Sequence, residues 1–150
     1  MSTRRRTTVR SALGAGALAV LLAGCGGAPQ LLSLTQACAQ DRDGSAVAVE
    51  GYLRADTSVS CSSYGGDFRC MLDTVESPTG SAGPKAGLDI LVGTGSDAMD
   101  ELPSSYTESD LRLRAHDGGA VHVGDRVRAS GKASTGPGVC FVTVDKLEKL

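Results

Sequence analysis

Two histidines and two aspartates lie close together in the sequence, on either side of a short glycine-containing turn. His116 and Asp117 come before the turn, and His122 and Asp125 come after it. Imidazole and carboxylate groups are zinc ligands, so these four residues form a candidate metal site. Their spacing matches no recognised zinc motif, and a solvated hairpin turn is the simpler interpretation. The metal site is therefore an alternative hypothesis.

Four arginines alternate with apolar residues in two nearby segments of the sequence. They are Arg112, Arg114, Arg126 and Arg128. If residues 111–115 pair antiparallel with residues 121–129, these arginine side chains share the solvent-facing side of a sheet. Such a row of cations would receive an anionic partner, namely a lipid headgroup, an acidic glycan or another protein. Tyr52, on an outward-facing strand position, is a further candidate contact. The alternative is an ordinary solvated sheet face.

The sequence offers no assembled set of catalytic residues. Nucleophilic mechanisms need a nucleophile, a base and an orienting group brought together. Serines are plentiful, but the chain has only two histidines, and both lie near one turn. We therefore expect a protein that is not an enzyme and that uses no cofactor, with a hydrolase as the most distant alternative.

The N-terminus has the composition of an export signal. The residues before Cys25 include four arginines and no acidic residue, and an apolar stretch runs from Ala12 to Ala23. This stretch is too short to cross a bilayer, because roughly 30 Å of hydrocarbon requires about 20 helical residues. A basic start followed by a short apolar run therefore predicts export rather than a membrane span.

The end of the apolar stretch, Leu22-Ala23-Gly24-Cys25, resembles the lipobox of bacterial lipoproteins. The resemblance implies cleavage after Gly24 and attachment of a diacylglyceryl group to Cys25. Residues 1–24 are then the signal peptide, and residues 25–30 are the lipidated cysteine and a flexible tether. Acyl chains anchor a protein to a bilayer without crossing it. We therefore expect an extracytoplasmic domain held on the inner, outer or single membrane of the cell.

Removal of the signal leaves an acidic domain. It takes four of the 15 basic residues and none of the 17 acidic ones, so the mature chain carries a net charge of −6 with neutral histidines. Proteins that bind a nucleic-acid backbone need a clustered basic surface. We therefore expect the membrane, and an envelope protein or glycan, as partners, and not a nucleic acid.

Four cysteines remain once Cys25 carries the lipid. They are Cys38, Cys61, Cys70 and Cys140. An even number of cysteines in an exported chain predicts disulfides, whereas a zinc site would need closely spaced cysteine pairs, which the sequence lacks. Among the possible pairings we favour Cys61–Cys70, which closes a short loop. The second pair is then Cys38–Cys140, which ties the N-terminal segment to the last strand.

Periodicity predicts a short helix followed by five strands. Leu31, Leu34 and Cys38 share one helical face, and from Val47 onward apolar residues alternate with polar ones. Residues 97–110 are irregular, and the fourth strand is entered by a hairpin. The helix is expected at about residues 31–40, and the strands at about residues 47–54, 68–76, 88–92, 121–131 and 139–147, with residues 111–115 as the first arm of the hairpin, which turns at residues 117–119.

Two segments resemble the strand signatures of exported oligonucleotide/oligosaccharide-binding (OB) folds: Val47-Ala-Val-Glu-Gly51-Tyr-Leu53 and Val123-Gly-Asp-Arg-Val-Arg-Ala-Ser-Gly131. The resemblance implies a mainly β domain over residues 31–150, built as a five-stranded closed barrel with a short N-terminal helix. Glycines such as Gly51 and Gly131 allow the strong coiling that a small barrel needs. One departure is residues 97–110, which make a poor helix where these folds usually carry one.

Fold alone does not determine function, so the functional hypothesis depends on the export signal and on the lack of catalytic residues. We expect a lipid-anchored, non-enzymatic module that binds a protein or a glycan in the cell envelope. The alternative is a carrier lipoprotein for a small ligand or a metal, which would use the turn at residues 116–125.

Overall fold

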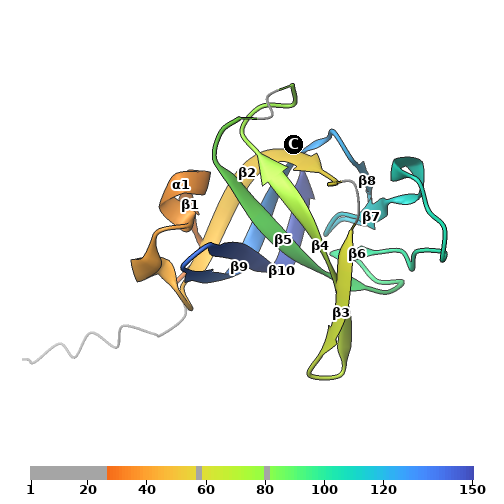
Figure 1. The fold of residues 1–150 in the computed structure, drawn as a ribbon, viewed down its shortest axis with the longest axis horizontal. Coiled ribbons are helices and arrows are strands. Elements are labelled where there is room, and N and C mark those ends of the chain that lie inside the picture. The colour runs from red at the N-terminus through yellow and green to blue at the C-terminus, as the bar shows by residue number, and fades with distance from the viewer. Residues whose placement is uncertain (1–26, 57–58, 80–81) are drawn as a thin grey trace, which may run out of the picture.

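Strands dominate the architecture (Figure 1), as the alternating pattern predicted. The computed structural model describes residues 27–56, 59–79 and 82–150, so the predicted signal peptide, the lipobox and Cys25 lie outside the described residues. The strands are β1 (Gln30–Leu32), β2 (Ala46–Arg54), β3 (Ser60–Tyr64), β4 (Asp67–Val75), β5 (Lys85–Val92), β6 (Ala98–Met99), β7 (Arg112–Arg114), β8 (Ala120–His122), β9 (Arg126–Gly136) and β10 (Val139–Lys149). The helical segments are α1 (Leu34–Ala37) and the 3-10 turns Gln40–Arg42 and Glu108–Asp110.

The five longest strands are hydrogen-bonded into a ring. Its order is β2–β4–β5–β10–β9 and back to β2. Neighbouring strands are antiparallel except β5 and β10, which run parallel. Successive side chains of a strand point to opposite faces; on β4, Cys70, Leu72 and Thr74 are buried while Met71 and Asp73 are partly exposed. The ring therefore has a buried inner face and a solvated outer face.

The buried side chains of the ring form the hydrophobic core. Leu53, Leu72, Leu88 and Val142 come from four different strands, and each is at most 1% exposed. Helix α1 adds Leu34, which is equally buried and belongs to the same cluster. Burying a side chain of this size contributes about 1.5 to 3 kcal/mol. The burial of these inward-facing apolar side chains therefore stabilises the ring.

The structure contains more strands than the five predicted: the hairpin that enters the predicted fourth strand is confirmed, but the strand itself is divided into β8 and β9. Gly124 has a φ of +92°, a conformation open mainly to glycine, and the turn there ends β8 before β9 begins. Strand β7 pairs with β6 and β8, whereas β9 pairs with β2 and β10. Residues 111–131 therefore form a short hairpin followed by a separate strand.

The N-terminal helix is shorter than the predicted span of residues 31–40. Gln30–Leu32 is extended and pairs parallel with β2. Ser33 then caps the helix, because its side chain accepts the Gln36 N–H while the Gln36 side chain accepts the Ser33 N–H. The helix covers only Leu34–Ala37. Leu31 therefore lies before it, on β1, and is exposed.

Two disulfides brace the domain, in the pairing favoured from the sequence. Cys38, at the end of α1, is bonded to Cys140 on β10, and Cys61 on β3 is bonded to Cys70 on β4. Disulfides of this kind persist in oxidising compartments, so they indicate an extracytoplasmic environment. Among the described residues, no helix has the length and apolar character needed to cross a membrane.

Candidate binding groove

A groove follows the outer face of β4, β5 and β10. It consists of two cavities of about 450 and 520 Å³, which adjoin because Asp73 and Lys85 line both of them. The strand register explains this placement, since Asp73 on β4 lies opposite Gly87 on β5, and Gly87 lies beside Phe141 on β10. Residues from three separate parts of the sequence therefore meet on one surface.

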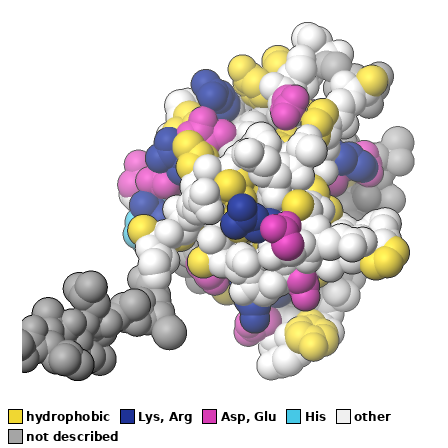
Figure 2. Space-filling view, turned by 90° about the vertical axis from the view of Figure 1, so that its left-hand side faces the viewer, with side chains coloured by type: hydrophobic (Ala, Val, Ile, Leu, Met, Phe, Trp, Pro, Cys, Tyr) yellow, Lys and Arg dark blue, Asp and Glu magenta, His cyan; other side chains and the backbone are white. Residues whose placement is uncertain are grey.

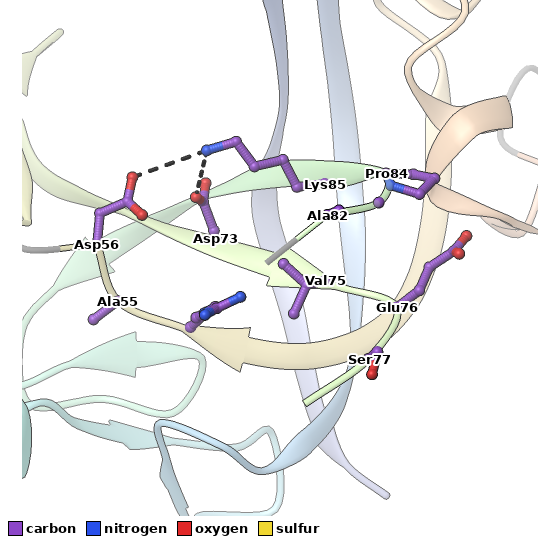
Figure 3. A pocket seen from close by; sticks show the side chains of 11 residues that line it. Ala55, Asp56, Asp73, Val75, Glu76, Ser77, Ala82, Pro84 and Lys85 are labelled. Carbon is purple, nitrogen blue, oxygen red and sulfur yellow. Dashed lines mark hydrogen bonds and ion pairs between the residues drawn. The ribbon is translucent and has the colours of Figure 1, made fainter. Parts of the chain in front are cut away.

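Charged groups line one half of the groove (Figure 3). The Lys85 ammonium Nζ lies 2.9 Å from Oδ2 of Asp73 and 3.9 Å from Oδ2 of Asp56. The hydrogen bond to Asp73 and the negative charge of its carboxylate raise the pKa of Lys85, so the amine is fully protonated at neutral pH. Arg54 and Glu76 complete the charged lining. This half therefore offers both hydrogen-bond donors and acceptors.

The other half of the groove is mainly apolar. Its lining includes Met71, Val139, Phe141 and the Cys38–Cys140 disulfide. A Cβ added to Gly87 would lie 2.6 Å from Sδ of Met71 and 3.0 Å from Cβ of Phe141. Glycine at this position thus allows both side chains to close over the strand and form an apolar surface.

Arg126 and Arg128, two members of the predicted arginine row, are paired with one carboxylate. Glu50 on β2 lies opposite Arg128 in the sheet, and its Oε1 is 2.6 Å from the Arg128 Nη2 while its Oε2 is 3.0 Å from the Arg126 Nη2. The hydrogen bond to Glu50 and its charge raise the pKa of Arg128. This cross-strand network compensates part of the positive charge that the sequence suggested for an anionic partner.

The other two arginines belong to a different part of the sheet. Arg112 and Arg114 lie on β7, and Arg114 forms an ion pair with Asp100 and donates to the Gly95 carbonyl at 2.7 Å. The predicted antiparallel pairing of residues 111–115 with residues 121–129 holds only as far as residue 122, because β7 pairs with the short strand β8 whereas β9 pairs with β2 and β10. The four arginines therefore do not form one continuous row.

Tyr52 lies on β2 next to the groove and lines neither of its two cavities. It is partly buried, with Val75 and Arg126 as its neighbours in the sheet, and it lines a smaller cavity beside Gly124. The structure therefore places Tyr52 beside Arg126 but not with Arg112. Its cavity adjoins the charged half of the groove, because Arg54, Ala55 and Val75 line both.

The four residues of the candidate metal site are not brought together. Nδ1 of His116 lies 2.7 Å from Oδ2 of Asp97, whereas Asp117 accepts the Gly119 N–H within the hairpin turn. Among the described residues, no group of three or more histidine, cysteine or acidic side chains is arranged to hold a metal ion. His116 thus pairs with Asp97 and Asp117 stabilises its own turn, so the described residues do not gather as the alternative metal site requires.

The remaining pair of that candidate site, His122 and Asp125, closes the turn between β8 and β9. The Asp125 carboxylate accepts the His122 N–H at 2.9 Å and the Lys149 ammonium at 2.6 Å. Partial burial favours the neutral acid, but these two hydrogen bonds and the nearby positive charges outweigh it and lower the pKa of Asp125. The carboxylate therefore stays ionised and holds the C-terminal strand to the turn.

Comparison with protein-family models, curated proteins and solved structures gave no significant match. The functional proposal therefore depends on the geometry of the groove and on the sequence. Sequence reasoning missed the groove residues Asp73, Lys85 and Phe141. The alternation of residues in β4 and β5 indicates which side chains point outward. It does not indicate which of these side chains lie next to each other on neighbouring strands.

Proposed function

We propose that this protein is a lipid-anchored, non-enzymatic module of the cell envelope, and that it binds a glycan in the groove on β4, β5 and β10. A lipid on Cys25 would hold the mature domain at the membrane surface. The single observation that carries the proposal is the adjoining of a charged cavity and an apolar cavity at Asp73 and Lys85. Ligand sites commonly combine an apolar surface with a few placed polar groups.

An OB-like closed barrel is the fold that we propose for the ring of strands. The circular order of β2, β4, β5, β10 and β9 supports it. In OB folds the face of the second and third barrel strands binds oligosaccharides or oligonucleotides. The groove lies on β4 and β5, which are the second and third strands of the ring in chain order, so its position agrees with this mode of binding.

Charge favours a sugar over a nucleic acid as the ligand. The mature chain carries a net charge of −6, and on the face shown in Figure 2 basic and acidic side chains are interspersed. A phosphate backbone needs a concentrated basic surface. Sugar hydroxyls can instead donate to the carboxylates of Asp56 and Asp73 and accept from Lys85, while the C–H faces of the rings pack on Phe141 and Met71.

A carrier for a small molecule is the second candidate. The cavity volumes of about 450 and 520 Å³ fall within the range of roughly 300 to 1,000 Å³ that is usual for small-ligand sites. A carrier would bind a single sugar or another small molecule as tightly as an oligosaccharide. A glycan module would gain affinity with each added sugar, because both halves of the groove then take part.

Substituting Lys85 tests the groove. We expect Lys85→Met to weaken the binding of oligosaccharides released from the cell envelope by about tenfold or more, since a hydrogen bond to a charged group is worth roughly 1.5 to 3 kcal/mol. Isothermal titration calorimetry measures this change. Lys132→Met is the matched control, because Lys132 is an exposed lysine on β9 outside the groove. Equal losses of affinity in the two variants would contradict the proposal.

A further inference from the structure

Within the part of the chain that the structure describes, strand β3 has a free edge without lysine, proline, a bulge or a paired strand to protect it. Among the described strands it pairs with β4 alone, and the β3–β4 hairpin projects away from the ring (Figure 1). Proteins normally blunt such an edge with lysine, proline, a bulge or a covering segment. The five residues of β3 are Ser60, Cys61, Ser62, Ser63 and Tyr64, none of which is charged. The edge is therefore open to another strand.

The backbone groups on this edge can be assigned from the register. Cys61 and Cys70 lie directly opposite each other with their Cα atoms 4.0 Å apart. This is close to the spacing of about 4.5 Å for a pair without mutual hydrogen bonds, and well below about 5.5 Å for a hydrogen-bonded pair. The N–H and C=O groups of Cys61, and of Ser63 two residues further on, therefore point away from β4.

We propose that two copies of this chain associate through their β3 edges, as antiparallel strands related by a twofold axis at Ser62. In this register Cys61 lies opposite the partner's Ser63, and both residues present their free backbone groups to each other. Each such pair would exchange both of its hydrogen bonds. Ser62 would lie opposite the partner's Ser62, and Tyr64 opposite the partner's Ser60. The two sheets would then continue across the interface.

The partner is a second copy because the edge is complementary to itself. The domain carries a net charge of −6, so copies repel each other over most of their surface, but pairing at β3 places no like charges opposite one another. The Tyr64 side chain, which is 85% exposed, would be partly covered by the added strand. An apolar or aromatic side chain that gains cover in this way adds to the association.

The hairpin is also held in the conformation that pairing requires. The Cys61–Cys70 disulfide joins its two strands, and the turn consists of Gly65 and Gly66, with φ values of +63° and +97°. Two glycines of this kind form the tight turn that matches the twist of a hairpin. Little chain entropy is therefore lost when the edge pairs, and the proposed membrane anchor would concentrate the copies in one plane.

Cysteine cross-linking in membranes tests this interface. Ser62→Cys, introduced into the full lipidated chain, would place two thiols opposite each other at the twofold axis. A mild copper-based oxidant is expected to shift the protein to a disulfide-linked dimer on a non-reducing gel. Ser104→Cys is the control, because Ser104 is exposed and lies outside β3 and its hairpin. Dimer formation by Ser62→Cys no greater than that of Ser104→Cys would overturn the proposal.

A second substitution distinguishes edge pairing from chance collision. Ser63→Pro removes an N–H that β4 does not use, so the hairpin should still form, but one hydrogen bond of each proposed pair is lost. Adding Ser63→Pro to Ser62→Cys is expected to remove most of the dimer band. An unchanged dimer band would overturn the proposed register. Cross-linking to a different protein in place of the dimer would overturn the choice of a second copy as the partner.

Discussion

Replacing Gly131 with alanine is expected to lower the free energy of unfolding by about 3 kcal/mol or more, the upper part of the range for overpacked cores. A Cβ at this position would lie 1.9 Å from the carbonyl oxygen of Thr143 and 3.2 Å from the backbone nitrogen of Asp145. Both contacts are with backbone, which cannot turn aside as a flexible side chain can. The pairing of β9 with β10 changes register beside this position, between Val144 and Lys146.

Gly136→Ala is the matched control for Gly131→Ala. Both glycines belong to β9, but a Cβ at Gly136 would have no atom within 4 Å, and its φ is not positive. Urea unfolding should therefore give Gly136→Ala a stability within about 0.5 kcal/mol of the wild type, as is usual for unconstrained surface positions. Similar stabilities for the two variants would show that β9 and β10 do not cross closely at Gly131.

Removing the Cys38–Cys140 disulfide is expected to have the second large effect. Its cysteines are 102 residues apart, and cross-linking a chain over such a distance stabilises the folded state by about 4 to 5 kcal/mol in the chain-entropy model. Small domains have total stabilities of about 5 to 15 kcal/mol. The double variant Cys38→Ala/Cys140→Ala should therefore unfold at a much lower urea concentration than the wild type.

The second disulfide supplies the comparison. Cys61 and Cys70 are only 9 residues apart, so their removal by Cys61→Ala/Cys70→Ala should cost about 3 kcal/mol in the same model. Alanine is chosen because Cys70 is buried, where a serine hydroxyl would need a partner. A greater loss of stability in this variant than in Cys38→Ala/Cys140→Ala would contradict the view that the length of the closed loop determines how much each disulfide stabilises the fold.

Alternation of apolar and polar residues was sufficient to predict the strands that have one face in the core. Strands β2, β4 and β5 were expected from this pattern because their side chains alternate between the buried and the outer face of the ring. The close contacts at Gly51 and Gly131 also agree with the role of strand glycines in coiling. Local patterns thus predict which residues face inward.

Features that depend on pairing could not be predicted in the same way. The irregular stretch of residues 97–110 includes β6, whose two residues pair with β5 and β7 and carry no alternation of their own. The row of four arginines failed for the same reason, because β7 pairs with β8 whereas β9 pairs with β2 and β10. The groove was missed because Lys85 and Phe141 meet only through the parallel pairing of β5 with β10.

Amide chemical-shift mapping of the mature chain, titrated with oligosaccharides released from the cell envelope, tests the proposed groove most directly. Binding there is expected to shift the resonances of Asp73, Lys85, Gly87 and Phe141 together, as residues of one outer face. Shifts centred on Arg126 and Arg128, or no shift at high oligosaccharide concentration, would contradict a glycan-binding groove on β4, β5 and β10.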